Sequence, residues 1–428
     1  MKIELLQNSR PLFGTISLEG DKSISHRAII LASLANGTTR INNLLESEDV
    51  FRTINAFKLM GVEIEKKGPV YVIKSKGIRG LKEPKEPLYF GNSGTTARLM
   101  IGLLAGLPFN SKVTGDSSLT KRPMDRVILP LKEMGAILSS QGRDMTLPLT
   151  IQGRQLHGFE YTIPVKSAQV KSALLFAGLL ANSATTVTEL AQTRNHTEIM
   201  LKEFGSNIIT EKHAITIKPT DSLIAGNLFI PGDISSASFW IVGALIVPGS
   251  HVRIKDLGLN DTRTGILDVL RKMGANVLLE EITEEAGERT GTLTIKHQPL
   301  KATTIEGDLI PRLIDEIPII ALLATQAEGT TIIRGAEELR VKETDRIKAI
   351  VTVLSTLGAT IKPTEDGMII KGKTSLTGGD VSSYDDHRIA MMIVIASLIT
   401  NQKVNIDKLS SISISYPRFF KDLKQLTE

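Results

Sequence analysis

Six apolar segments recur along the chain, and a small cluster of polar residues comes directly before each of them. The clusters begin at Asp21, Asn92, Lys166, Asp233, Asp315 and Asp386. The intervals between these positions are 71, 74, 67, 82 and 71 residues. Spacing this regular indicates six copies of one structural unit.

Each apolar segment predicts a helix with almost no polar face, which belongs in the interior of a domain. These helices are expected over Ala28–Ala35, Ala97–Leu107, Ala173–Ala181, Ala237–Val247, Pro318–Ala324 and Ile389–Leu398. If the three helices of one domain run parallel, their positive dipole ends gather on one face, where anions bind.

The rest of each unit follows a common order of strand and helix signals. Strands are predicted at Gly37–Ile41 and Gly329–Ile333, and later in the units at Val70–Lys74 and Gly367–Lys371. Between them come amphipathic helices at Val50–Met60, Arg126–Met134 and Ile266–Met273. Glycines that suit a left-handed C-cap end these helical segments, at Gly61, Gly135, Gly205, Gly274 and Gly358. The pattern predicts a mixed α/β fold of βαβαββ repeats.

The two ends of the chain suggest how the repeats form domains. The sixth unit stops after a helix at Pro417–Leu426, while two strand-like segments, Lys2–Leu6 and Gly14–Leu18, precede the first unit. We therefore predict one domain of residues 1–20 plus 229–428, completed by the N-terminal strands, and an inserted three-repeat domain of residues 21–228. The chain would cross between the domains twice.

Composition narrows the function classes. The chain has 428 residues, 41% hydrophobic and 23% charged, with a net charge of +5 and 4% aromatic residues, which argues against a nucleic-acid partner. It contains no cysteine, so disulfides, thiolate metal sites and a cysteine nucleophile are excluded. Its longest apolar run, Ile389–Thr400, has 12 residues, too few to span a bilayer. We expect a cytoplasmic protein.

In the first half of the chain, cations and small polar residues stand at helix starts. Lys22, Ser23 and Arg27 share one helical start and could converge on a phosphate or carboxylate, although solvated charges beside an N-cap are the alternative. Gly94 leaves backbone N–H groups open to a ligand. Further on, the candidates are weaker: Arg122 could be a surface charge, and Ser167 and Gln169 could belong to an ordinary helix cap.

The second half contains the densest cluster. Asp315 comes immediately before an apolar helix, where a carboxylate could simply be the N-cap. Lys342, Arg346 and Arg388 lie at later helix starts, and capping alone does not explain them. His387 could be a structural histidine. The seven histidines show no metal-ligand spacing, so no metal site is expected.

Together these segments resemble the 3-phosphoshikimate 1-carboxyvinyltransferases, also called 5-enolpyruvylshikimate-3-phosphate (EPSP) synthases. The matching motifs are Gly20–Arg27, Gly91–Thr95, Lys121–Met124, Lys342–Arg346 and Asp386–Arg388, in family order. The resemblance implies two similar domains, each of three βαβαββ repeats with buried parallel helices, joined by two crossover strands. It implies enolpyruvyl transfer from phosphoenolpyruvate to the 5-hydroxyl of shikimate 3-phosphate, in aromatic amino-acid biosynthesis, with no cofactor and no metal.

The resemblance also assigns residues. Shikimate 3-phosphate would be held by Lys22, Ser23, Arg27, Ser167, Gln169, Arg194, Asp315 and Lys342. Phosphoenolpyruvate would be held by Lys22, Gly94, Arg122, Gln169, Arg346 and Arg388. Asp315 is the candidate base, and Glu343 and Lys22 are candidates for proton delivery. Gly94 keeps the small residue that leaves room for the inhibitor glyphosate in this family, which makes sensitivity a hypothesis.

Two positions depart from the family pattern. Ala168 stands where many relatives have serine, and Ser413–Pro417 lacks a lysine that some relatives place there. One alternative is the enolpyruvyl transferase that acts on UDP-N-acetylglucosamine, which usually has a catalytic cysteine loop. The other is a noncatalytic anion-binding or nucleic-acid-binding repeat protein. We expect a monomer that binds small anionic substrates, no nucleic acid and no membrane.

Overall fold

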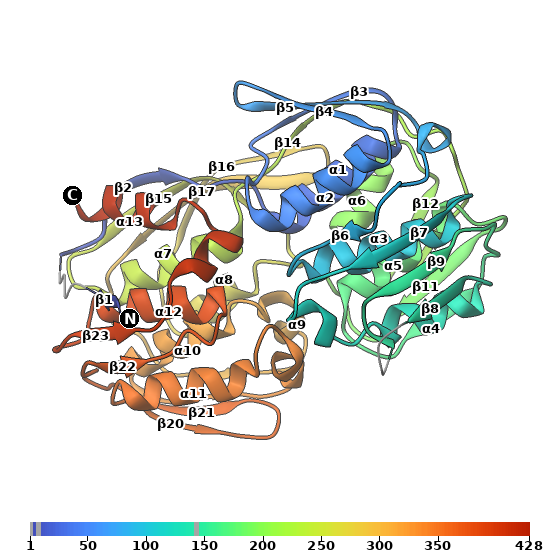
Figure 1. The fold of residues 1–428 in the computed structure, drawn as a ribbon. Helices are drawn as coiled ribbons and strands as arrows, with labels where there is room; N and C mark the ends of the chain where they lie inside the picture. The colour runs from blue at the N-terminus through green and yellow to red at the C-terminus, as the bar shows by residue number, and fades with distance from the viewer. Residues whose placement is uncertain (1–2, 6–9, 141–144) are drawn as a thin grey trace. The chain divides into compact units, whose positions relative to one another are not determined.

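The structure is a computed structural model that describes residues 3–5, 10–140 and 145–428. The chain divides into two compact units (Figure 1). The N-terminal unit contains Gly20–Ile230 with Glu285–Gly287, and the C-terminal unit contains Met1–Glu19, Pro231–Glu284 and Glu288–Glu428.

The described residues of the N-terminal unit form three four-stranded sheets. In sheet order, their strands are β14 (Asn227–Phe229), β3 (Asn36–Asn42), β5 (Val70–Lys76) and β4 (Glu63–Lys67); β6 (Leu88–Tyr89), β7 (Asn110–Thr114), β9 (Leu149–Gln152) and β8 (Ile137–Ser140); and β10 (Glu160–Ile163), β11 (Thr185–Glu189), β13 (Ala214–Ile217) and β12 (Ile208–Glu211). The buried helices are α1 (Lys22–Leu34), α3 (Gly94–Gly106) and α5 (Ala168–Leu179), and the amphipathic ones are α2 (Glu48–Leu59), α4 (Asp125–Glu133) and α6 (His196–Glu203).

The C-terminal unit repeats this plan. Its sheets are β2 (Phe13–Ser17), β15 (His251–Gly258), β17 (Glu288–Lys296) and β16 (Leu278–Glu285); β18 (Thr304–Ile305), β19 (Gly329–Ile333), β21 (Met368–Gly372) and β20 (Thr360–Pro363); and β22 (Gly379–Val381), β23 (Val404–Ile406) and β1 (Ile3–Leu5). Its buried helices are α7 (Ile234–Ile246), α10 (Ile317–Gln326) and α12 (His387–Ser397). The other helices are α8 (Gly265–Lys272), α9 (Leu309–Leu313), α11 (Arg346–Thr356) and α13 (Phe419–Thr427).

Every sheet is built in the same way. The first two strands are parallel, as β6 and β7 are. Where these two strands follow each other in the chain, a buried helix crosses between them, as α3 does between β6 and β7. The second strand then pairs antiparallel with the strand that closes the repeat, as β7 does with β9. This order confirms the predicted βαβαββ repeat and the mixed α/β fold.

Strands from distant parts of the chain complete three of the sheets. In the C-terminal unit, β1 pairs antiparallel with β23 and β2 pairs parallel with β15. The predicted first strand extends to Lys2 and Leu6, which lie outside the described residues. In the N-terminal unit, β14 pairs parallel with β3 and supplies the first strand of the first repeat. A limit at residue 228 would therefore divide β14, and the contacts place the division after Ile230.

Helix ends follow local chemistry. Gly61, Gly135, Gly205, Gly274 and Gly358 all have φ between 82° and 90°, the left-handed conformation predicted for a glycine C-cap. In the middle of α3, Gly102 has a different role, because a Cβ there would lie 2.1 Å from the carbonyl oxygen of Ala173 on α5. Glycine thus allows these two buried helices to touch. Among the described residues, no helix has the length and apolar character that a membrane span requires.

Candidate active site

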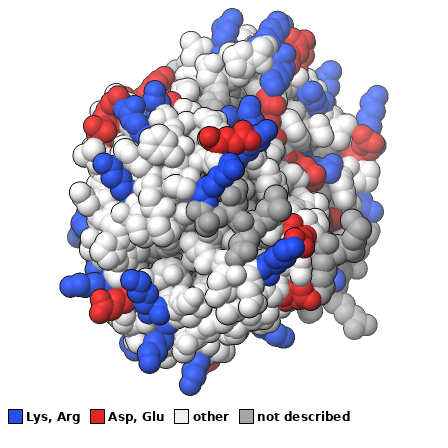
Figure 2. Space-filling model, turned by 90° about the vertical axis from the view of Figure 1, so that its left-hand side faces the viewer, with Lys and Arg blue, Asp and Glu red and all other residues white. Residues whose placement is uncertain are grey.

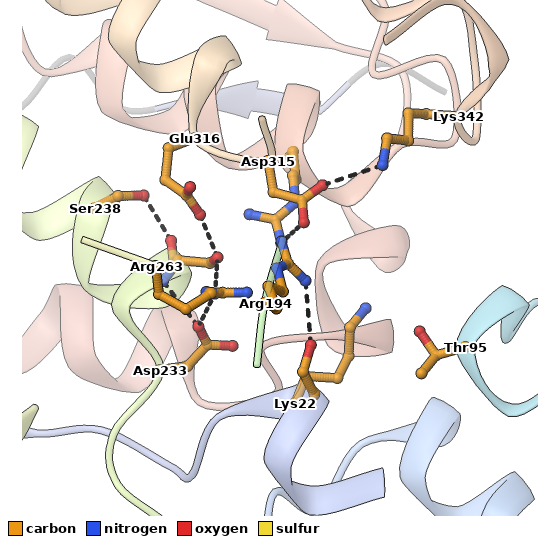
Figure 3. A network of polar contacts seen from close by, with 12 residues as sticks. Lys22, Thr95, Arg194, Asp233, Ser238, Arg263, Asp315, Glu316 and Lys342 are labelled. Atoms are coloured by element: carbon orange, nitrogen blue, oxygen red, sulfur yellow. Dashed lines mark hydrogen bonds and ion pairs between the residues drawn. The ribbon is translucent and has the colours of Figure 1, made fainter. Parts of the chain in front are cut away.

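Asp315 lies between α9 and α10 in the C-terminal unit, and it does not cap α10. The N-cap position belongs to Glu316, which makes no side-chain capping bond. Instead, Oδ1 of Asp315 is 3.3 Å from Nη1 of Arg346 and 3.8 Å from Nζ of Lys342, and Oδ2 is 4.0 Å from Nη2 of Arg388. Figure 3 shows the contact with Lys342. The capping alternative for Asp315 is therefore wrong.

Arg346, the first residue of α11, is the centre of this cluster. Its side chain is 1% exposed and contacts Asp386 through Nε at 2.8 Å and Glu343 through Nη2 at 2.7 Å. Burial alone would lower the pKa of the Arg346 guanidinium, but the carboxylates of Asp386, Glu343 and Asp315 raise it above its ordinary value. Arg346 is thus a permanent cation held at a fixed position.

The cluster contains three cations, Lys342, Arg346 and Arg388, and three carboxylates, Asp315, Glu343 and Asp386. Asp386 is fully buried and also caps α12, because its Oδ1 accepts a hydrogen bond from the backbone N–H of Arg388 at 2.8 Å. Lys342 and Glu343 are partly exposed, at 31% and 22%. The structure therefore brings together all the site residues predicted in the second half of the sequence, which are Asp315, Lys342, Glu343, Arg346 and Arg388.

In the N-terminal unit, α1 positions Lys22, Ser23 and Arg27. Nζ of Lys22 is 3.1 Å from Oδ2 of Asp49 on α2. Arg27 is buried, and its guanidinium donates to Thr197 Oγ1, to Ser172 Oγ and to the carbonyl of Ser23. A buried guanidinium is a strong donor to phosphate and carboxylate oxygens.

Arg194 joins this group. It precedes α6, and its Nη1 donates to the hydroxyl of Ser23 at 3.1 Å. Ser167 does what the capping alternative expected, since it is the N-cap of α5 and accepts from the N–H of Val170 at 3.4 Å.

Gln169 connects the α5 start to the α3 start. Its Nε2 donates to Thr95 Oγ1 at 2.9 Å, and its Oε1 accepts from Arg98 Nη1 at 2.7 Å. A Cβ on Gly94 would lie 3.0 Å from Nη1 of Arg122 and 3.1 Å from Nη1 of Arg98. Glycine at this position therefore leaves room between two guanidinium groups.

Arg122 is buried at 9% exposure and donates to Oδ1 of Asn92 at 2.5 Å. The surface-charge alternative for Arg122 is therefore wrong. Arg98 was not predicted as a site residue, although it follows the Gly91–Thr95 motif closely in the sequence. Its position one turn after Gly94 was the available signal, because residues four apart share a helical face.

A buried ion cluster in the N-terminal unit was also missed. Lys171 is fully buried, and its Nζ is 3.0 Å from Glu189 and 2.6 Å from Glu198. A lysine in the first turns of an otherwise uncharged helix was the signal in the sequence. No group of three or more histidine, aspartate or glutamate side chains that could hold a metal ion is found in the part of the chain that the structure describes.

His26, between Ser25 and Arg27 on α1, gives a pH-dependent stability. Burial, and then the charges of Lys22 and Arg27, lower the pKa of His26 well below its ordinary 6.5, while Asp21 acts in the opposite direction. The unfolded chain takes up a proton as the pH falls through 6.5, whereas the folded chain does not. We expect the free energy of unfolding to decrease below that pH by up to about 1.4 kcal/mol per unit from this residue.

Urea unfolding of the wild type and of His26→Asn between pH 5 and 7 measures this contribution. Asparagine can keep a polar contact with Thr53, whose hydroxyl lies 2.8 Å from Nδ1 of His26. The variant should lose part of the decrease in stability at low pH. Equal pH slopes in the two proteins would show that His26 does not cause it.

Comparison with known proteins adds to this geometry. The family model for EPSP synthase (3-phosphoshikimate 1-carboxyvinyltransferase) matches residues 6–423. The chain is 56% identical to the 3-phosphoshikimate 1-carboxyvinyltransferase of Oceanobacillus iheyensis, covering 98% of this chain and 97% of that one. It is 52% identical to the enzyme of the same name from Streptococcus pyogenes, with 99% of each chain covered.

Solved structures agree. An EPSP synthase from Acinetobacter baumannii superposes with a TM-score of 0.89 at 41% identity, covering 100% of this chain and 98% of that chain. The enolpyruvyl transferase NikO from Streptomyces tendae has a TM-score of 0.79 at 15% identity and shares the fold. The resemblance inferred from the motifs is thereby confirmed, and the chain belongs to the EPSP synthase (3-phosphoshikimate 1-carboxyvinyltransferase) family.

Proposed function

We propose which of the described side chains bind the substrates and which transfer protons in the reaction of the EPSP synthase family. That reaction transfers the enolpyruvyl group of phosphoenolpyruvate to the 5-hydroxyl of shikimate 3-phosphate and releases phosphate. The chain is a transferase of the shikimate pathway. In this reaction a C–O bond to the 5-oxygen forms, the C–O bond to phosphate breaks, and the hydroxyl gives up its proton.

One observation supports the assignment of a base more than any other. The carboxylate of Asp315 is 14% exposed and lies within 4.0 Å of Lys342, Arg346 and Arg388. Cations at these distances keep a carboxylate ionised and can hold an anionic substrate beside it. Asp315 accordingly takes the proton of the 5-hydroxyl, and general base catalysis of this kind is worth roughly 10²–10⁴-fold.

Proton delivery falls to Glu343 and Lys22. Glu343 lies beside Arg346 and is partly exposed, so it can exchange protons with solvent and serve the methylene carbon. Lys22, at the start of α1, has a point charge and three donors that suit the leaving phosphate.

Substrate binding is assigned to two sets of side chains. Shikimate 3-phosphate is held by a set of hydroxyl, amide and charged side chains: Lys22, Ser23, Arg27, Ser167, Gln169, Arg194, Asp315 and Lys342. Phosphoenolpyruvate is held mainly by guanidinium groups, with a glycine leaving space: Lys22, Gly94, Arg122, Gln169, Arg346 and Arg388. Both sets are rich in cations because both substrates are anionic, and cationic side chains pair with phosphate and carboxylate.

The wider setting is also part of this proposal. The protein acts as a cytoplasmic monomer, and the three-repeat N-terminal unit, extended to Ile230 so that β14 stays whole, forms a domain that a protease can release folded. It binds no nucleic acid, an expectation supported by the face in Figure 2, where Lys and Arg are scattered, some of them beside Asp and Glu, and do not form a basic stripe.

A calorimetric titration separates the alternatives. Shikimate 3-phosphate should bind, and phosphoenolpyruvate should bind more tightly in its presence. UDP-N-acetylglucosamine and a single-stranded RNA should give no heat beyond dilution. Binding of UDP-N-acetylglucosamine instead of shikimate 3-phosphate would contradict the proposed acceptor.

A further inference from the structure

A second polar network, which begins at Glu316, the residue after Asp315, lies in the interior of the C-terminal unit. Glu316 is 1% exposed, and its Oε1 accepts a hydrogen bond from the hydroxyl of Ser235 at the start of α7. The same hydroxyl accepts from Nη2 of Arg263 at 2.7 Å. Arg263 is also 3.3 Å from Asp233, which caps α7 (Figure 3). All four side chains are buried.

Arg312, three residues before Asp315, is anchored to residues on either side of Arg263 in the sequence. Nε of Arg312 on α9 donates to the carbonyl of Asp261 at 2.7 Å, and Nη1 is 2.7 Å from Asp268. The start of α8 comes so close that a Cβ on Gly265 would lie 3.0 Å from Cβ of Arg312. Asp261 and Asp268 thus contact the chain before Asp315 directly, whereas Arg263 supports the residue after it through Ser235.

Two consecutive side chains in this connection belong to separate charge networks. The carboxylate of Asp315 contacts Arg346, whereas that of Glu316 contacts Ser235. Glu316 could have capped its own helix but does not. Burying a carboxylate away from water is costly unless hydrogen bonds compensate, so the bond to Ser235 fixes Glu316 in one position.

We infer that Glu316 is a positioning residue for Asp315. The hydrogen bond from Ser235, whose hydroxyl also accepts from Arg263, holds Glu316 in place, and Glu316 in turn holds the neighbouring Asp315. The inference rests on the proposed function, in which Asp315 takes the proton of the 5-hydroxyl. Peptide geometry transmits the position of Glu316 directly to Asp315, and a displacement of about 1 Å at a reacting group can cost ~10²-fold in rate.

The test compares Glu316→Ala with Glu316→Gln. Alanine removes the acceptor, so kcat should fall between about tenfold and a hundredfold, while the KM for shikimate 3-phosphate changes less than about threefold. Glutamine keeps an oxygen for Ser235 and should restore most of kcat. Ser235→Ala removes only the bridging hydroxyl and should also lower kcat, which keeps the test informative if Glu316→Ala does not fold.

A double-mutant cycle with Asp315→Asn completes the experiment. If Glu316 acts through Asp315, adding Glu316→Ala to Asp315→Asn should cost no further activity. An equal loss in both backgrounds would overturn the inference, as would wild-type kcat in Glu316→Ala and Ser235→Ala. A fully active Asp315→Asn enzyme is a different failure, because it refutes the proposed base and leaves nothing to position.

Discussion

Replacing Asp315 by asparagine should lower kcat by roughly 10²–10⁴-fold, because the amide cannot take the proton of the 5-hydroxyl. Asparagine keeps the size of the side chain and one oxygen for Lys342 and Arg346. Binding of shikimate 3-phosphate should therefore weaken by less than about tenfold, or about 1.4 kcal/mol. Steady-state kinetics and calorimetric titration of the same preparation measure the two effects.

Asp308→Asn is the matched control. Asp308 is exposed at the start of α9 and makes no side-chain capping bond, so the same chemical change there should leave both quantities unaltered. Undiminished turnover in Asp315→Asn would remove Asp315 from the role of base. A loss of binding as large as the loss of kcat would assign it to substrate binding alone.

The second large effect is expected for Arg346→Met. Arg346 is 1% exposed and pairs with Asp386, Glu343 and Asp315. Removing it leaves the fully buried carboxylate of Asp386 without this partner, which typically costs about 3–5 kcal/mol. Urea unfolding should show this as a lower midpoint with an unchanged slope. Arg346→Lys keeps the charge but loses the fork of donors, so its loss of stability should be smaller.

Lys348→Met provides the comparison for this variant. Lys348 lies two residues further along α11, and its side chain is exposed. Its replacement should change the free energy of unfolding by less than about 0.5 kcal/mol. If Arg346→Met were as stable as Lys348→Met, the buried ion pairs around Arg346 would not stabilise the C-terminal unit.

Much of the fold could be predicted from the sequence because its repeats are strongly periodic. A helix such as α10 is apolar on all sides, and β19 was predicted with the bounds that the structure has. The strand β14 was beyond prediction, since only three residues form it and its partner, β3, lies almost 200 positions earlier. Pairing between such distant segments depends on tertiary contacts.

Some residues of the candidate site could likewise be predicted from the sequence, and others could not. Asp315, Lys342, Arg346 and Arg388 could be found because polar residues at the starts of apolar helices stand out. Glu316 and Arg263 could not, because a glutamate at a helix start and an arginine in a loop are common on protein surfaces. Only the structure shows that Ser235 connects them inside the C-terminal unit.

The most direct measurement is phosphate release by the purified protein with each substrate alone and with both together. We predict release only when phosphoenolpyruvate and shikimate 3-phosphate are both present, with one enolpyruvyl product formed per phosphate. Phosphate release that does not require shikimate 3-phosphate, or that occurs when UDP-N-acetylglucosamine replaces it, would contradict the account.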